Sequence, residues 1–355
     1  MRITRREFLR MAAYAAAAAG VSQFDILRLQ KAMAATGDKP AVIWFEGLGD
    51  SGCVVSLANY FDGTSGIDSV LLNSIELKFN SVLMGASGQL AIDEAEKVYQ
   101  ATPPYDTQPY VLVVTGGIAN LDGYCIVLED YNSGNAVPDG KMQMVDALSR
   151  WQTNAAYVLY VGACACYGGV NTIRGNYKAT WNPLGQNPGL TSPPTHDKAL
   201  PYGSLVQIEH YNYGKSVFIP GCPAHPDWIV LTIVHLLTYG MPTRDNFGRP
   251  LTLMGQNIFN ETVHQNCPRK IQHDLGNFAE WVGDTDKCMR MVGCRGKETH
   301  GPCPVMGWNK TDLYNSGKLA YCTALGINHI CVGCTEVFFP DVPLNREINN
   351  IDTTP

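Results

Sequence analysis

The sequence predicts an α/β domain built on a mostly parallel sheet, followed by a loop-rich domain with little regular secondary structure. Short apolar runs alternate with helix-compatible stretches up to about residue 245, which is typical of strands joined by crossover helices. Beyond that point strand and helix signals become rare, and seven of the twelve cysteines fall within the 68 residues from Cys267 to Cys334. A segment of this kind is more readily stabilised by bound metal than by a hydrophobic core of its own.

Four apolar runs predict the strands of the sheet. A loop with a polar or sulfur-bearing residue follows each run, and parallel strands bring their carboxyl ends to the same edge of a sheet. We therefore expect Cys53, Cys164 and Cys222, which follow three different runs, to form one set of ligands. The runs are Ala41–Phe45, Tyr110–Thr115, Tyr157–Val161 and Ser216–Ile219.

The composition is that of a globular protein with room for about two domains. The chain has 355 residues, of which 45% are hydrophobic and 16% are charged. Its net charge is −6, and the chain without its first 34 residues carries 20 basic and 30 acidic side chains, a net charge of −10. An acidic surface without a basic run attracts phosphate backbones poorly, so no nucleic-acid partner is expected.

Residues 1–34 are predicted to be an export signal. The segment TRREFLR, which contains Arg5 and Arg6, resembles a twin-arginine signal, and an alanine-rich run and a cleavable Ala32-Met33-Ala34 site follow it. An amphipathic N-terminal helix with a chance arginine pair is the alternative. The longest later apolar run, Ile229–Leu237, is shorter than the ~20 residues that cross a bilayer. We expect no transmembrane segment in this chain.

Cysteines in an exported protein ordinarily form disulfides. The twin-arginine route, however, carries proteins that have already folded in the reducing cytoplasm, so we expect metal ligands and keep disulfides as the alternative. The loop-rich domain supplies two sets of four candidate ligands, and either zinc or iron-sulfur clusters could use such sets. Together with the set at the sheet they make three sites, which favours a row of redox centres over three structural zincs. The two sets are His264, Cys267, Cys288 and Cys294, and Cys303, Cys322, Cys331 and Cys334.

The order of these motifs resembles that of the small, iron-sulfur subunit of the [NiFe] hydrogenases over essentially the whole chain beyond the signal. The matching stretches are WFEG at Trp44, SGC ending at Cys53, VGAC ending at Cys164, IPGCPAHPDW from Ile219, HQNCPRK from His264, CMRMVGCRG from Cys288, GPCPVMGWN from Gly301 and CVGCTE from Cys331.

The resemblance implies a flavodoxin-like domain at 35–245 that holds a proximal cluster, and a C-terminal domain at 246–355 that holds a medial and a distal cluster. It implies a periplasmic uptake hydrogenase in which electrons from H2, oxidised at a Ni-Fe centre in a separate large subunit, pass through three clusters to a cytochrome or a membrane-bound acceptor. A cluster subunit of a quinone-reducing complex, and an exported binding protein stabilised by zinc or disulfides, are the alternatives.

The family pattern also assigns ligands. Asp50 stands where most members have the first cysteine of Cys-x-x-Cys, so Asp50, Cys53, Cys164 and Cys222 are expected to bind a proximal [4Fe-4S] cluster. The same replacement occurs in some oxygen-resistant members, which makes oxygen tolerance an expectation. The alternative is that Asp50 only caps the following turn, while Cys166 or a water completes the cluster.

The resemblance assigns the distal [4Fe-4S] cluster to His264, Cys267, Cys288 and Cys294. The medial cluster is assigned to Cys303, Cys322, Cys331 and Cys334. Many members have a proline near position 322 and a [3Fe-4S] cluster; here Cys322 predicts [4Fe-4S], and [3Fe-4S] stays open.

Two further positions complete the predictions. Cys125 is expected to pack as a small hydrophobic residue. Thr115 stands where the family usually has a glutamate, so a carboxylate near the proximal cluster is expected to be missing.

Overall fold

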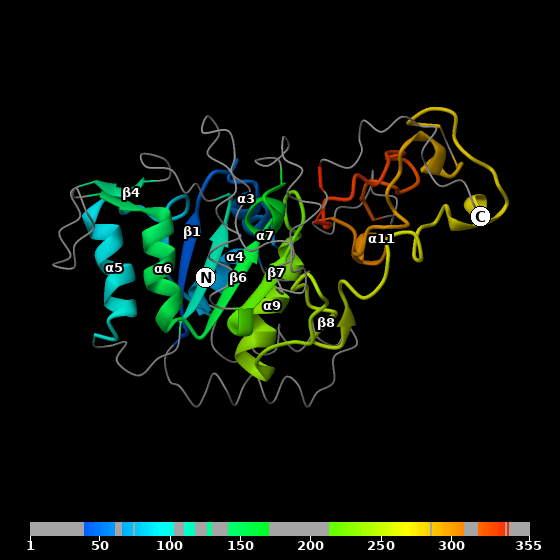
Figure 1. Ribbon diagram of the computed structural model, residues 1–355. Coiled ribbons are helices and arrows are strands. Elements are labelled where there is room, and N and C mark those ends of the chain that lie inside the picture. The colour runs from blue at the N-terminus through cyan, green and yellow to red at the C-terminus, as the bar shows by residue number, and fades with distance from the viewer. Residues whose placement is uncertain are drawn as a thin grey trace, which may run out of the picture.

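The computed structural model describes most of the chain between residues 39 and 340. The described ranges are 39–60, 66–73, 75–102, 110–117, 126–129, 141–169, 213–284, 286–308, 319–337 and 339–340. The predicted signal at 1–34 and Cys125 lie outside them. Figure 1 shows the two parts of the chain, a sheet with helices on both faces and a loop-rich segment beside its edge.

A five-stranded parallel sheet forms the first part, in the order β2-β1-β3-β6-β7. Numbered along the chain within the sheet, this is the order 2-1-3-4-5 of flavodoxin-like folds, with a switch of direction between β1 and β3. The four strands expected from apolar runs are confirmed. The strands are β1 (Ala41–Glu46), β2 (Glu76–Asn80), β3 (Val111–Thr115), β6 (Tyr157–Val161) and β7 (Ser216–Ile219).

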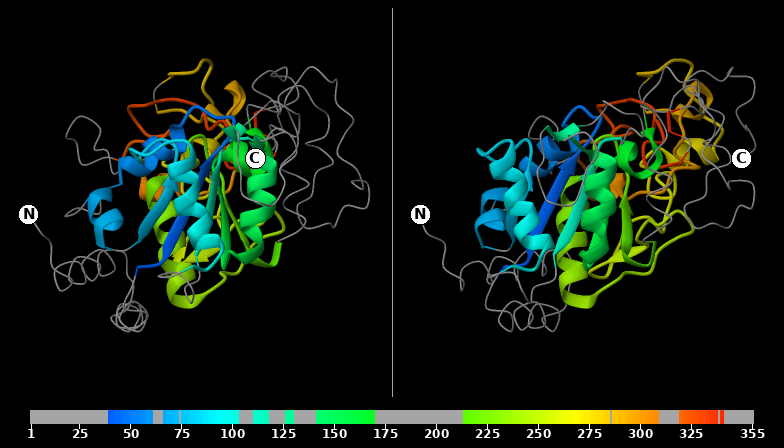
Figure 2. Two further views of the ribbon diagram at one scale, coloured as in Figure 1. Left: turned by 90° about the vertical axis from the view of Figure 1, so that its left-hand side faces the viewer. Right: turned by 60° about the vertical axis from the view of Figure 1, so that its left-hand side comes forward.

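Strands β1, β3, β6 and β7 are buried on both faces, to which their side chains point alternately. In β1, Ile43 and Phe45 enter a hydrophobic cluster with α5 and α6, while Val42 and Trp44 enter another with α3 and α9. Figure 2 shows the sheet between these helices. The helices are α3 (Gly52–Ala58), α4 (Ile67–Asn73), α5 (Gln89–Tyr99), α6 (Met144–Asn154), α7 (Ala163–Tyr167) and α9 (Pro226–Tyr239).

The second part is loop-rich, as expected. Among its described residues no helix exceeds five residues, and its hydrophobic clusters are small, with Ala279, Met289 and Ile330 in one and Tyr321 and Ala324 in the other. Its elements are β8 (Thr252–Leu253), β9 (Gln256–Asn257), α10 (Lys270–Asp274), η5 (Met289–Val292) and α11 (Cys303–Met306).

The remaining elements belong to the first part. They are β4 (Ile126–Glu129), β5 (Lys141–Gln143) and η4 (Tyr213–Lys215).

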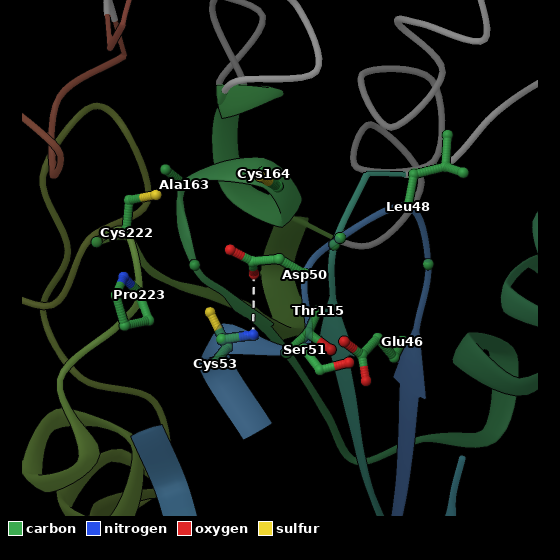
Figure 3. Close-up of a pocket in the computed structure, with 16 residues that line it drawn as sticks. Glu46, Leu48, Asp50, Ser51, Cys53, Thr115, Ala163, Cys164, Cys222 and Pro223 are labelled. Carbon is green, nitrogen blue, oxygen red and sulfur yellow. Dashed lines mark hydrogen bonds between the residues drawn. The ribbon is translucent and has the colours of Figure 1, made fainter. Parts of the chain in front are cut away.

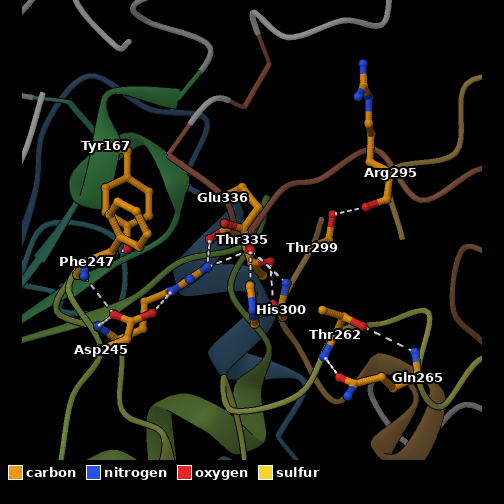
Figure 4. Close-up of polar contacts among 11 residues, drawn as sticks. Tyr167, Asp245, Phe247, Thr262, Gln265, Arg295, Thr299, His300, Thr335 and Glu336 are labelled. Atoms are coloured by element: carbon orange, nitrogen blue, oxygen red, sulfur yellow. Dashed lines mark hydrogen bonds and ion pairs between the residues drawn. The ribbon is translucent and has the colours of Figure 1, made fainter. Parts of the chain in front are cut away.

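A buried ion-pair network joins the two parts (Figure 4). The fully buried guanidinium of Arg249 donates to Asp245 at 2.6 Å and to Glu336 at 2.7 Å, and the backbone N–H of His300 also donates to Glu336 at 2.7 Å. Removing one partner from such a pair strands a buried charge and costs about 3–5 kcal/mol. The network therefore fixes the segment that ends in residues 331–337 against the sheet domain.

No helix in the described part of the chain combines the length and the apolar character needed to cross a bilayer.

Candidate metal centres

The first candidate centre lies at the carboxyl edge of the sheet. Asp50, Cys53, Cys164 and Cys222 line one cavity of about 500 Å³. They come from the loop after β1, the first turn of α3, helix α7 and the loop after β7. Figure 3 shows the Asp50 carboxylate among the three cysteines. The three cysteines predicted as one set are thus brought together, with Asp50 beside them.

The turn that carries Asp50 has a defined geometry. Ser51 adopts a left-handed conformation with φ 60°, and the backbone N–H of Gly52 donates to Oδ1 of Asp50 at 2.9 Å. This is the local hydrogen bond that aspartate commonly makes in turns. A carboxylate has two oxygens, so this hydrogen bond leaves Oδ2 able to bind a metal, and the two expected roles of Asp50 are compatible.

Gly162 permits the close approach of the loops. Its φ is 91°, and a Cβ at this position would lie 2.4 Å from Sγ of Cys53. Only glycine combines this backbone conformation with that contact. The start of α7 can therefore pack directly on the cysteine of α3.

The electrostatics of the cavity suit a bound cation. Burial raises the pKa of the Cys53 thiol to about 12, and the nearby acidic groups of Cys164, Cys222 and Asp50 raise it further. Burial likewise raises the pKa of Cys222 to about 11, with added contributions from Cys164 and Asp50. Thiols that resist ionisation in this way become thiolates when a metal supplies the positive charge. The donor set and the space thus fit an iron-sulfur cluster.

Cys166 faces away from the cavity. It is fully buried, its Sγ donates to the carbonyl of Tyr160 at 3.2 Å, and it packs in the hydrophobic cluster of Phe45 and Phe218. Cys53 packs on the other cluster. The geometry therefore disfavours Cys166 as the alternative to Asp50 for completing this centre.

Glu46 is a site residue that the sequence reasoning missed. It is paired in register with Thr115 on the adjacent strand and lines the same cavity, and its Oε2 is buried without a hydrogen-bond partner among the described residues. The expectation that a carboxylate is missing here was wrong, because the neighbouring strand supplies one. A glutamate at the end of an otherwise apolar strand was the available signal.

The medial set is assembled around α11. Burial raises the pKa of Cys334 to about 12, and the nearby Cys322 raises it further. Burial also raises the pKa of Cys303, and Cys334 and Cys322 add to that shift. The structure therefore brings Cys322 to the other cysteines of its predicted set.

The distal set is also brought together. Burial raises the pKa of Cys294 to about 11, and Cys267 and Cys288 raise it further. Burial lowers the pKa of His264, and so do His273 and nearby lysines, which favours the neutral imidazole that binds metals. The imidazole of His264 packs edge-on against that of His273, with the ring centroids 4.6 Å apart.

The three sets are neighbours in the fold. The backbone N–H of Cys331 donates to Sγ of Cys294 at 3.4 Å, which joins the medial to the distal set. Cys222 lies near enough to Cys334 to influence the pKa of that thiol, which relates the proximal to the medial set. All eleven cysteines in the described ranges are free thiols, which is contrary to the disulfide alternative.

Two family models match the chain. Residues 51–236 match the 20 Kd subunit of NADH ubiquinone oxidoreductase, and residues 259–344 match the C-terminal region of the NiFe/NiFeSe hydrogenase small subunit. The first match covers the sheet domain beyond β1 and includes Cys53, Cys164 and Cys222, while Asp50 lies just before it. The second covers the predicted ligands of both remaining sets.

Known proteins resemble the chain over nearly its full length. The periplasmic [NiFeSe] hydrogenase small subunit of Desulfomicrobium baculatum is 30% identical over 351 residues, covering 96% of this chain and 97% of that protein. The hydrogenase-2 small chain of Escherichia coli K12 is 29% identical over 342 residues, covering 94% of this chain and 77% of that protein.

Solved structures agree with these sequence matches. The [NiFeSe] hydrogenase of Dm. baculatum superposes with a TM-score of 0.66 at 27% identity, covering 86% of this chain and 98% of that chain. That of Desulfovibrio vulgaris Hildenborough gives a TM-score of 0.64 at 29% identity, covering 89% and 98%. The chain belongs to the family of [NiFe] and [NiFeSe] hydrogenase small subunits, which carry iron-sulfur clusters and pair with a separate large subunit.

Proposed function

We propose that this chain is the electron-transferring subunit of a periplasmic [NiFe] uptake hydrogenase and relays electrons from H2 oxidation in the large subunit through three clusters to an external acceptor. The observation that carries the proposal is the hydrogen bond from the backbone N–H of Cys331 to Sγ of Cys294, which links two of the three predicted ligand sets. When bound, iron-sulfur clusters supply one-electron carriers.

The proximal [4Fe-4S] cluster would be held by Asp50, Cys53, Cys164 and Cys222. A carboxylate is a harder ligand than a thiolate and binds iron less covalently. It is therefore easier to displace and rebind when the charge of the site changes. This property underlies the proposal that the enzyme tolerates oxygen.

The distal [4Fe-4S] cluster would be held by His264 together with Cys267, Cys288 and Cys294. A neutral imidazole brings less negative charge than a thiolate, which raises the potential of the site. This suits the last centre before an external acceptor. The medial cluster would be a [4Fe-4S] cluster held by Cys303, Cys322, Cys331 and Cys334.

The periplasmic location rests on the predicted twin-arginine signal at 1–34. It is supported by relatives that are named periplasmic, in Desulfomicrobium baculatum and Solidesulfovibrio fructosivorans. The large subunit would be exported together with this chain. The acceptor would be a soluble cytochrome or a separate membrane subunit.

The match of residues 51–236 to the 20 Kd subunit of NADH ubiquinone oxidoreductase favours one alternative, a cluster subunit of a quinone-reducing complex. That alternative accounts for the proximal set alone. It leaves the eight candidate ligands from His264 to Cys334 without a role.

The test is to purify the complex of both subunits without oxygen and to measure its iron, sulfide and visible spectrum. We expect a brown protein with roughly twelve iron atoms in this chain, the content of three four-iron clusters, and visible absorption that bleaches under H2. About four iron atoms would favour the quinone-reducing alternative. A colourless complex would contradict the proposal outright.

A further inference from the structure

A threonine next to a predicted medial ligand contacts a cysteine of the distal set. The side-chain oxygen of Thr323 lies 3.6 Å from Sγ of Cys267, at hydrogen-bonding distance for a sulfur atom. Thr323 directly follows Cys322, whereas Cys267 lies 56 residues earlier in the chain. A residue of the medial segment thus reaches the sulfur of a predicted distal ligand.

A buried arginine holds the backbone of Thr323 in this position. The guanidinium of Arg269 donates through Nε to the carbonyl of Thr323 at 3.1 Å and through Nη1 to the carbonyl of Lys287 at 2.8 Å. Arg269 is 2% exposed and follows Cys267 by two residues. Lys287 directly precedes Cys288. The arginine therefore ties Thr323 to two stretches of chain that carry distal cysteines.

The loop from Cys322 to His329 is closed by its own hydrogen bond. The backbone N–H of His329 donates to the carbonyl of Cys322 at 3.0 Å. Near the end of the same loop, the side chain of Asn328 accepts a hydrogen bond from Nη2 of Arg269. The arginine therefore anchors this loop near both of its ends, and the side chain of Thr323 is held in one place.

The chemistry of the pair decides which group donates. A cysteine that binds iron does so as a thiolate, which has no proton to give. A threonine hydroxyl has one proton and can rotate it toward an acceptor. When Cys267 binds iron, the hydroxyl of Thr323 must therefore be the donor and the sulfur the acceptor. Thr323 is 2% exposed, and a hydrogen bond shielded from water is electrostatically stronger than an exposed one.

We propose that Thr323 raises the reduction potential of the distal centre by donating a hydrogen bond from its hydroxyl to Sγ of Cys267. The proposal rests on the proposed function, since it takes Cys267 as a cluster ligand. Reduction makes a cluster more negative, and a hydrogen bond to a ligand sulfur stabilises that state. The hydroxyl thus acts in the same direction as the neutral imidazole of His264. The medial segment thereby contributes to the potential of the distal centre.

The experiment is a redox titration of the assembled complex of both subunits, followed by electron paramagnetic resonance, with iron analysis of each variant. Thr323→Val keeps the shape of the side chain and removes the donor, so we expect the distal potential to fall while the iron content stays unchanged. Thr323→Ser keeps the hydroxyl and should retain most of the wild-type potential.

Thr335→Val is the matched control. Thr335 also directly follows a predicted medial ligand, Cys334, and is also buried. Its hydroxyl, however, donates to the carbonyl of His300 at 2.7 Å. We therefore expect Thr335→Val to have the distal potential of the wild type. An equal fall in both valine variants would assign the effect to the loss of any buried hydroxyl and would overturn the proposal.

An unchanged distal potential in Thr323→Val with full iron content would also overturn the proposal, and so would a Thr323→Ser variant that behaves like Thr323→Val. If Thr323→Val loses distal iron, Thr323→Ala decides, because it removes the hydroxyl without placing a methyl group against the sulfur. An unchanged distal potential in Thr323→Ala then overturns the proposal. A wild-type complex without a distal cluster would instead contradict the proposed function.

Discussion

The backbone N–H of Cys331 donates to the sulfur of Cys294 at 3.4 Å, so a residue of the medial set is hydrogen-bonded to a residue of the distal set. Cys222 of the predicted proximal set in turn influences the pKa of Cys334 in the predicted medial set. Residues of adjacent predicted sets therefore lie close together, an arrangement suited to the proposed passage of electrons along a row.

Replacing Asp50 tests the proposed proximal ligand. Asp50→Cys should give a conventional four-cysteine cluster with an altered potential, and Asp50→Ala should change the spectrum of the proximal centre. Cys166→Ala should leave that centre intact, because Cys166 donates to Tyr160 and does not line the cavity. Redox titration with electron paramagnetic resonance measures both. The aspartate assignment fails if Cys166→Ala abolishes the centre while Asp50→Ala leaves its spectrum and potential unchanged.

Replacing Cys322 tests the type of the medial cluster. We expect Cys322→Ala to convert a [4Fe-4S] cluster into a three-iron cluster, since one iron loses its protein ligand. The oxidised variant should then show the paramagnetic signal of a [3Fe-4S] centre, which the wild type should lack. Cys166→Ala is the matched control, because it removes a buried cysteine outside the three sets. A wild-type protein that already shows the signal would refute the four-iron assignment.

Gly162→Ala tests the close packing at the proximal centre. The new Cβ would meet Sγ of Cys53 at 2.4 Å, so the loops must separate and the proximal iron should be lost. Gly255→Ala is the control, because Gly255 also has a positive φ, 80°, but no heavy atom lies within 4 Å of its added Cβ. Both variants place an L-residue in the left-handed region, which costs about 1–2 kcal/mol. Equal iron contents in the two variants would show that the contact with Cys53 is unimportant.

The lowered pKa of Glu96 predicts that the sheet domain loses stability at acid pH. Burial alone would raise its pKa, but hydrogen bonds from Arg150 and Trp151 outweigh burial and lower the pKa below 4.5. The unfolded chain therefore binds a proton at higher pH than the folded chain, and stability is lost as pH falls below about 4.5. Hydrogen-exchange protection of α5 and α6 should decline in this window.

Glu96→Gln should flatten that decline and lower the protection of α5 and α6 at neutral pH. The loss corresponds to about 3 kcal/mol, because it breaks a buried pair in which Arg150 lies 2.8 Å from Glu96. Glu94→Gln is the matched control, since its pair with Lys97 is exposed and contributes little. An unchanged pH profile in Glu96→Gln would assign the acid sensitivity to another group.

Replacing Arg5 and Arg6 with lysine tests the export proposal. We expect both subunits to accumulate in the cytoplasm, because the large subunit would leave only when bound to this chain. Cell fractionation with antibodies against each subunit measures the outcome. A large subunit found outside the cytoplasm in this variant would demonstrate independent export.

The sheet domain and the grouping of three cysteines at its edge could be predicted from the sequence alone. Four strands were readable because they are buried on both faces and therefore consist of apolar runs. Cys53, Cys164 and Cys222 could be grouped because the carboxyl ends of parallel strands share an edge. Strand β2 was missed, since Glu76–Asn80 is an edge strand whose polar residues do not form such a run.

The directions of individual side chains became apparent only in the folded structure. Cys164 and Cys166 are two residues apart in α7, which places them about 200° apart around the helix axis; one therefore lines the cavity while the other enters the core. Glu46 joins the site because the register between β1 and β3 pairs it with Thr115. The sequence of each strand on its own does not specify that register. The imidazole of His225 contacts the carbonyl of Gly307, 82 residues away, and such a contact exists only once the chain has folded.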